Sequence, residues 1–200
     1  MNPRTGFYSG GAIENAILNS AAIEMGRYYG LPVEGSGGGT DQFVSGIQAG
    51  YERALTAMMP MLSWPDLMVG PGLLGSSMIL SFEQLLIDIE IFRMNKQSHR
   101  GIIASQEQWL DEVIDRVGPA GNFLGERSTR DGIQSGTWLT NRLGVHEPLQ
   151  AWEKAGRPSI TEEVREKIEY ILANYKPLPL DEYTERELEK VVQRAKNSVA

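Results

Sequence analysis

Two short apolar segments, each followed by a glycine-rich loop and a helical pattern, constrain the fold of this chain most. Residues 31–35 precede a glycine loop at 36–40, and residues 66–70 precede a second one at 71–77. Helical patterns flank these segments, over residues 11–29, 41–64 and 81–99. Short strands that alternate with helices are typical of parallel sheets with crossover helices. The pattern therefore predicts an α/β fold with both glycine loops at the carboxyl end of the sheet.

The number of strands limits which α/β fold is complete in this chain. We count three strand candidates, including one at residues 6–9. Such strands suit an α/β barrel or a doubly wound sheet, but a complete eight-stranded barrel takes about 250 residues. Three strands would leave exposed sheet edges. We therefore expect a barrel that is incomplete in this chain, or a sheet that a partner completes.

The helical patterns also predict which side chains are buried. Gly30 and Pro32 end the first helix, whose apolar residues at helical spacing are Ile13, Ile17, Ala21, Met25 and Tyr28. The corresponding residues of the second helix are Phe43, Ile47, Tyr51, Leu55 and Met58. Those of the third are Leu85, Leu86, Ile89 and Phe92.

Three helix starts have recognisable capping residues. Asp41 is the predicted N-cap of the second helix. Ser81 with Gln84, and Ser105 with Gln108, have the spacing of a capping box.

The sequence pattern of the second half predicts helices and no further strands. Its segments are a helix over 105–117, an irregular stretch with short helical pieces over 122–158, a helix over 161–175, a stiff linker at 176–180 and a last helix over 181–196. The predicted inward residues of the last two helices are Val164, Ile168, Ile171, Leu172, Leu188, Val191, Val192 and Ala195. We divide the chain into βα units over residues 1–120, and an irregular segment with C-terminal helices over residues 121–200.

Composition excludes several classes of function. The net charge of −7 argues against a nucleic-acid or membrane surface, because both need a basic field. The chain has no cysteine, which rules out disulfides and thiolate metal sites, and no apolar run spans a bilayer. His99 and His146 lack a second ligand at metal spacing, so we expect no tightly bound metal. We expect a cytoplasmic protein.

The two glycine loops are the candidate site, because ligands of α/β proteins bind at the carboxyl ends of the strands. Adjacent glycines either allow close approach to a ligand or form a tight turn, and the sequence leaves both readings open. A phosphate site is the weaker version, since no Walker lysine follows and Asp41 would repel an anion. Among the carboxylates, Glu34 is predicted at a strand's carboxyl end, facing the pocket. Asp66 starts a strand and is predicted to be structural.

A resemblance to a known family rests on the order and spacing of several short segments. They are residues 11–16 (GAIENA), 28–32 (YYGLP), 35–41 (GSGGGTD), 48–52 (QAGYE), 70–74 (GPGLL), 81–88 (SFEQLLID), 121–124 (GNFL) and 152–156 (WEKAG). Together they resemble the C-terminal half of the trimethylamine/quaternary-amine:corrinoid methyltransferases, in the branch without pyrrolysine. The resemblance spans nearly the whole chain.

The resemblance implies a fold and an activity. The fold would be the C-terminal part of a TIM-like (β/α)8 barrel with additional C-terminal helices. The activity would move a methyl group from a methylated or quaternary amine, such as glycine betaine, to the cobalt of a corrinoid carried by a partner protein. Other expected partners are a second copy or the upstream half of the barrel.

The resemblance also assigns candidate residues to the two ligands. An amine cation is held by aromatic faces and a carboxylate, for which Glu34, Tyr51 and Trp64 are the candidates. The glycine loops would let the corrinoid approach. Their residues are Gly35, Gly37, Gly38, Gly39, Thr40, Asp41, Gly70 and Gly72.

Two other readings remain open at this point. In the first, the chain is a non-catalytic half-barrel subunit that completes a partner. In the second, which is less favoured, it is a phosphate-binding barrel fragment.

Overall fold

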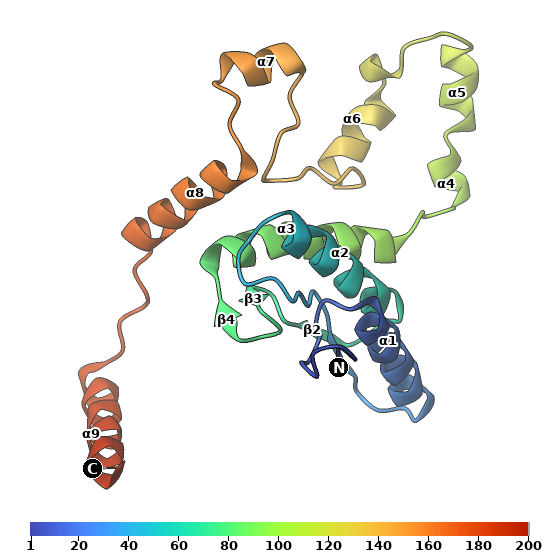
Figure 1. Ribbon diagram of the computed structural model, residues 1–200. Coiled ribbons are helices and arrows are strands. Elements are labelled where there is room, and N and C mark those ends of the chain that lie inside the picture. The colour runs from blue at the N-terminus through green and yellow to red at the C-terminus, as the bar shows by residue number, and fades with distance from the viewer. Residues whose placement is uncertain (200) are drawn as a thin grey trace. The chain divides into compact units, whose positions relative to one another are not determined.

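The computed structural model describes residues 1–199, with no side-chain description for Val199. It divides into two compact units, residues 1–166 and residues 167–199, which meet within one helix. The elements of the first unit (Figure 1) are α1 (Ile13–Tyr28), β1 (Glu34–Ser36), α2 (Ile47–Leu62), β2 (Leu67–Val69), β3 (Leu73–Leu74), β4 (Ile79–Leu80), α3 (Phe82–Arg100), α4 (Gln106–Trp109), α5 (Asp111–Val117), the 3-10 helix η1 (Phe123–Gly125), α6 (Arg127–Gln134) and α7 (Leu149–Lys154). The shared helix is α8 (Ile160–Asn174), and the second unit adds α9 (Glu182–Val199).

The predicted parallel pair of strands is confirmed. β1 and β2 lie parallel, with Gly35 opposite Met68, and α2 connects them as the crossover helix. α1 and α3 both pack against α2. The described residues are mostly helical, and their two small sheets have two strands each. The structure therefore contains one βαβ unit and does not itself close a barrel.

The third predicted strand is wrong. Residues 6–9 form no strand, and a small antiparallel hairpin of β3 and β4 instead lies within and just after the second glycine loop. The loop 71–77 is thus partly extended rather than entirely irregular. This hairpin joins β2 to α3 and fixes the path of the chain between them.

The predicted buried face of α2 is also wrong, and the reason is polar chemistry. Ile47 is 91% exposed and Tyr51, Leu55 and Phe43 are exposed as well. The buried residues of α2 are Ala49, Arg53, Thr56, Ala57 and Pro60. The polar face turns inward because, as shown below, its side chains bond the glycine loops. The apolar face is therefore left on the surface of the described residues.

The predicted buried face of α1 is wrong as well, although the residues that α1 buries are apolar. It buries Ala16 and Ile23, whereas Ile13, Ile17, Met25 and Tyr28 are exposed. The helix itself ends as predicted, with Gly30 in the left-handed region.

The capping predictions have mixed outcomes. Ser81 caps α3, accepting a hydrogen bond from the Gln84 N–H at 3.1 Å. Ser105 precedes α4 but makes no side-chain cap. Asp41 does not cap α2, which begins six residues later with Gly46 as its N-cap.

In the second half of the chain, the predicted ranges of the helices agree with the structure better than the predicted buried residues do. The helix predicted over 105–117 is broken into α4 and α5 at Leu110, which has a positive φ of 56°. The short pieces over 122–158, the helix α8 and the helix α9 are present. Val164 is buried, but the residues predicted to face inward from α9 are exposed.

The two serines provide a matched test of capping. We expect Ser81→Ala to lower the free energy of unfolding by about 1 kcal/mol, because it removes the acceptor of an otherwise unpaired helix N–H. Ser105→Ala removes no such bond and is expected to change stability by less than roughly 0.5 kcal/mol. Urea unfolding followed by circular dichroism measures both. Equal effects of the two substitutions would contradict the assignment of the cap.

Candidate functional site

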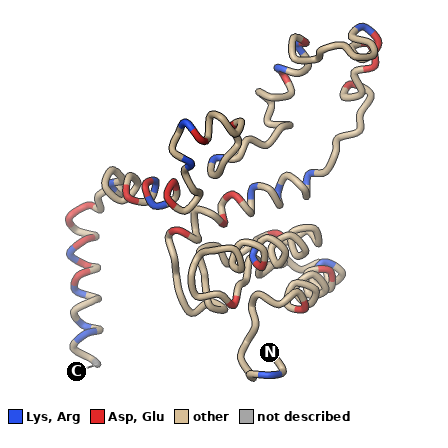
Figure 2. Tube along the Cα trace, turned by 45° about the horizontal axis from the view of Figure 1, so that its top comes forward, with Lys and Arg blue, Asp and Glu red and all other residues tan. Residues whose placement is uncertain are grey.

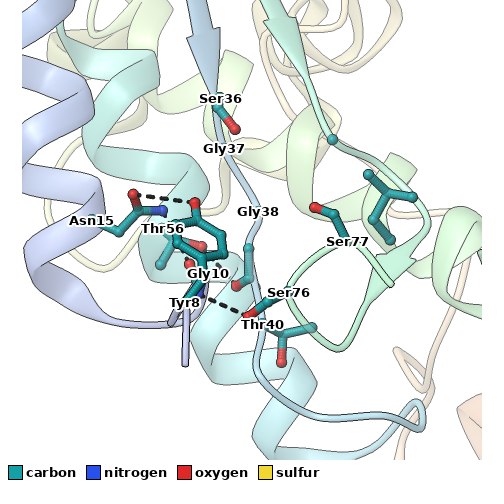
Figure 3. Close-up of a pocket in the computed structure, with 13 residues that line it drawn as sticks. Tyr8, Gly10, Asn15, Ser36, Gly37, Gly38, Thr40, Thr56, Ser76 and Ser77 are labelled. Carbon is teal, nitrogen blue, oxygen red and sulfur yellow. Dashed lines mark hydrogen bonds between the residues drawn. The ribbon is translucent and has the colours of Figure 1, made fainter. Parts of the chain in front are cut away.

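A small pocket lies at the carboxyl ends of β1 and β2, where the sequence predicted the site (Figure 3). Its volume is about 30 Å³, enough for a water molecule. It is lined by Tyr8, Gly10, Asn15, Ser36, Gly37, Gly38, Gly39, Thr40, Thr56, Gly70, Leu73, Ser76 and Ser77. Both glycine loops and the N-terminal segment thus contribute to one pocket.

α2 holds the first glycine loop through its buried polar face. The Thr56 hydroxyl donates to the carbonyl oxygen of Gly39 at 3.0 Å. The Glu52 carboxylate accepts from the Thr40 hydroxyl at 2.5 Å and from the Asp41 N–H at 3.0 Å. These bonds fix the end of the loop against one face of the helix.

Asp41 joins three segments that are distant in sequence. Its carboxylate accepts hydrogen bonds from the Ser9 hydroxyl, from the Gly11 N–H at 3.1 Å and from the Ser76 hydroxyl at 2.7 Å. The N-terminal segment and both glycine loops are therefore tied to one side chain. Burial alone would raise the pKa of Asp41, but the hydrogen bonds from Ser9, Gly11 and Ser76 together hold it below its ordinary value.

This pKa predicts how stability depends on pH. A carboxyl group whose pKa is lower in the folded than in the unfolded protein stabilises the fold above its unfolded pKa, near 3.8, and loses that effect as the pH falls through the folded value. We expect the urea midpoint to fall more between pH 5 and pH 3 in the wild-type chain than in Asp41→Asn. Parallel pH profiles of the two proteins would show that Asp41 makes no such contribution.

A buried ion pair holds the second glycine loop. Arg53 of α2 and Asp88 of α3 form a salt bridge in which both side chains are fully buried. The Arg53 guanidinium also donates to the carbonyl oxygens of Leu73 and, at 2.9 Å, of Gly70. The Asp88 carboxylate accepts from the Gly72 N–H at 2.6 Å. The Arg53 side chain thus pairs with carbonyl oxygens of the loop, and the Asp88 side chain pairs with an N–H group of the same loop.

Gln84 completes the surroundings of Asp88 by donating to its carboxylate at 2.8 Å. Burial raises the pKa of Asp88 above its ordinary value, against the lowering effect of the bonds from Arg53, Gly72 and Gln84. Asp88 is therefore a structural carboxylate whose lone pairs are already occupied by the chain.

The glycines are explained by close packing inside the chain. A Cβ on Gly39 would collide with the backbone of Gly10, and a Cβ on Gly70, which also has a φ of +115°, would lie 2.6 Å from the carbonyl oxygen of Gly37. A Cβ on Gly35 would lie 2.7 Å from the end of the Met68 side chain, and a Cβ on Gly37 would lie closer still, so that side chain would have to move aside.

Gly38 and Gly72 have positive φ values of 70° and 84°. Gly35, Gly37, Gly38, Thr40 and Gly72 are all buried. The chain's own packing accounts for these residues, so the corrinoid approach implied by the family resemblance is not needed to explain them.

The three predicted amine-binding residues do not come together at this pocket. Glu34 begins β1 instead of ending it, which removes the geometric reason for choosing it, and its side chain is exposed. Tyr51 is exposed on the outer face of α2. Trp64 packs against His99 with ring centroids 3.8 Å apart and ring planes tilted by 54°, and its carbonyl oxygen accepts from Arg27 at 2.9 Å. The cationic Arg27 beside Trp64 is unfavourable for a second cation.

Sequence reasoning missed the residues that organise the pocket. They are Ser9, Glu52, Arg53, Thr56, Ser76 and Asp88. A signal for Arg53 was present, since it lies three residues before Thr56 and between two alanines, Ala49 and Ala57, that mark a close helix contact. No local pattern marks the others.

Two further findings concern ligands and membranes. Among residues 1–199 no three His, Asp or Glu side chains are grouped as a metal site would require. Within the same residues, no helix combines the length and apolarity needed to cross a membrane.

Comparison with known proteins identifies the family. A sequence model described as "Trimethylamine methyltransferase (MTTB)" matches residues 1–200. The trimethylamine methyltransferase MttB of Methanosarcina barkeri (strain Fusaro / DSM 804) is 32% identical over 187 residues, which is 92% of this chain and 37% of the relative. The glycine betaine methyltransferase of Desulfitobacterium hafniense (strain Y51) is 30% identical over 195 residues, which is 96% of this chain and 40% of the relative.

These matches define both the family and its extent here. The chain spans about two fifths of the length of the curated relatives that it matches. Because the family model matches the whole sequence, the chain belongs to the trimethylamine methyltransferase (MTTB) family.

Proposed function

We propose that this chain is part of a cytoplasmic methyltransferase that takes a methyl group from a methylated or quaternary amine and passes it to a corrinoid carried by a partner protein. The observation that carries the proposal is the family match over residues 1–200. Relatives named for trimethylamine and for glycine betaine point to small methylated amines as the substrate class.

The same proposal interprets the fold. Residues 1–120 would be βα units from the C-terminal part of a (β/α)8 barrel, and residues 121–200 would be helices that pack on it. Supporting this are the parallel β1–α2–β2 unit and the coverage of about two fifths of the relatives. The exposed apolar faces of α1 and α2 also suit a chain that packs against further structure.

For a quaternary amine, the chemistry makes modest demands on this chain. A quaternary nitrogen leaves as a neutral tertiary amine when its methyl group is removed, so no acid has to deliver a proton. The bound corrinoid supplies the methyl-accepting cobalt. The residues described here hold the carboxyl ends of β1 and β2 in fixed positions, through Glu52, Thr56 and the Arg53–Asp88 pair.

The pocket does not fit either ligand. Small-molecule sites usually have volumes of roughly 300–1,000 Å³, whereas this pocket holds about 30 Å³. Most of the glycine-loop residues are buried by the chain itself. We therefore expect the amine and the corrinoid to bind outside this pocket, on surfaces that the rest of the enzyme helps to form.

Exposed side chains of this chain remain candidates for contact with the amine in the complete enzyme. Tyr51 and Glu34 are exposed and free to contact a cation, whereas Trp64 already packs against His99. We expect Tyr51→Leu to raise the KM for a quaternary amine roughly tenfold, because cation–π contacts contribute about 1–2 kcal/mol. Steady-state kinetics of the chain assembled with the remaining portion of a relative measure this.

The alternative is a non-catalytic subunit that completes a partner's barrel. The small pocket and the exposed apolar faces of α1 and α2 favour it equally. Tyr28→Leu, an exposed tyrosine of α1, is the matched control for Tyr51→Leu. If the two substitutions leave the KM equally unchanged while the assembled enzyme is active, the non-catalytic reading is favoured.

A further inference from the structure

The last helix, α9, has an apolar stripe that nothing in its own unit covers. Leu188, Val191 and Val192 are 51%, 61% and 50% exposed, and Ala195 continues the stripe one turn further. They recur at the three- and four-residue spacing that places side chains on one face of a helix. Such a face is typical of a helix that packs against another helix.

Charges flank the stripe in an ordered way. On a helix of about 3.6 residues per turn, Glu185, Glu189 and Lys196 lie along one side of the stripe, and Glu187 and Arg194 lie along the other. On both sides the acidic residues come first and the basic residue comes last. Figure 2 shows that the charged residues nearest the C-terminal end of α9 are basic.

We propose that α9 pairs with the α9 of a second copy of this chain in antiparallel orientation. A two-fold axis perpendicular to both helices brings each flank against the same flank of its partner, running in the opposite direction. Glu185 and Glu189 then face Lys196, and Glu187 faces Arg194. This orientation places opposite charges together on both sides of the stripe.

The parallel orientation has the opposite result. It brings one flank against the other at the same height, so Glu185 and Glu189 lie near Glu187, and Lys196 lies near Arg194. Like charges at such positions are unfavourable. Between two copies of α9, the charge order therefore favours the antiparallel orientation over the parallel one, and the inference does not depend on the proposed enzyme activity.

The register follows from the stripe itself. Its centre lies between Val191 and Val192, so these residues would face each other across the axis, and Leu188 would face Ala195. Two copies of Leu188 would be about 10 Å apart along the axis, from a rise of 1.5 Å per residue. Four apolar side chains per helix make a small contact, so we expect the association to weaken as salt screens the charges.

Disulfide trapping tests both the contact and its direction, because the full chain has no cysteine of its own. We expect Val192→Cys to form a disulfide-linked dimer under mild oxidation, since its Cα atoms would lie within about 7 Å. Leu188→Cys and Ala195→Cys should each link poorly alone and readily when mixed. Arg186→Cys, on the opposite face of α9, is the control and should not link.

Charge reversal gives an independent measurement. Glu189→Lys should lower the yield of the Val192→Cys dimer several-fold, and adding Lys196→Glu should restore it. Arg186→Glu should leave the yield unchanged. The proposal is overturned if Val192→Cys links no better than Arg186→Cys, or if Leu188→Cys and Ala195→Cys each link efficiently alone, as parallel helices would.

Discussion

Replacing Asp88 with alanine is expected to lower the free energy of unfolding by about 3–5 kcal/mol, because it leaves the Arg53 guanidinium buried without a counter-charge. The same substitution removes the acceptor of the buried Gly72 N–H. Both effects act on the second glycine loop. The urea midpoint of the chain, followed by circular dichroism, measures the loss.

The exposed pair of Arg165 and Glu83 is the matched control. It joins α8 to α3 at 3.4 Å with both side chains largely in solvent. Exposed pairs contribute about 0–1 kcal/mol, so Glu83→Ala should have a small effect. Equal effects of Asp88→Ala and Glu83→Ala would contradict the assigned role. The double variant Arg53→Met with Asp88→Leu should be more stable than Asp88→Ala, because no unpaired charge remains.

Two alanine substitutions at glycines are expected to have opposite signs. Gly39→Ala should destabilise the protein by about 1–3 kcal/mol, because the new Cβ meets the backbone of Gly10, which has no flexible end to move aside. Gly50 lies inside α2, where an added Cβ meets nothing. Gly50→Ala should stabilise the protein by about 0.5–1 kcal/mol, because alanine is the better helix former.

Unfolding midpoints of the two variants against the wild-type chain measure both signs. If Gly39→Ala is neutral, the first glycine loop is not packed against the N-terminal segment. Its glycines would then favour the ligand reading, one of the two that the sequence left open.

The elements that the sequence predicted well have local signals. Gly30 and Pro32 mark the end of α1, and the serine of the Ser81 capping box lies where α3 begins. The two glycine loops could be placed at the strand ends because a βα alternation determines that position without any long-range information.

Burial could not be predicted in the same way. Periodicity shows which side of a helix is apolar, but not whether this chain covers that side. In α2 the carbonyl groups of the glycine loops need donors, so Arg53 and Thr56 turn inward and Ile47 and Tyr51 turn outward. The usual expectation that a helix buries its apolar side therefore fails for α2.

The organisation of the pocket was hidden by sequence distance. Asp41 looked like a helix cap because an aspartate shortly before a helix often is one. Its partners Ser9 and Ser76 lie 32 and 35 residues away, and Asp88 lies 35 residues from Arg53. No spacing rule connects such residues, so only the fold reveals them.

Methyl transfer to cob(I)alamin tests the central proposal most directly. The chain is combined with the portion of the glycine betaine methyltransferase that lies outside the matched region, and visible spectra are recorded without oxygen over a panel of methylated amines. The relative's own matched segment serves as the positive control. We predict methylcobalamin that depends on one amine and on both portions. No methylcobalamin from any amine, when the two portions are folded and associated and the control is active, would contradict the proposal.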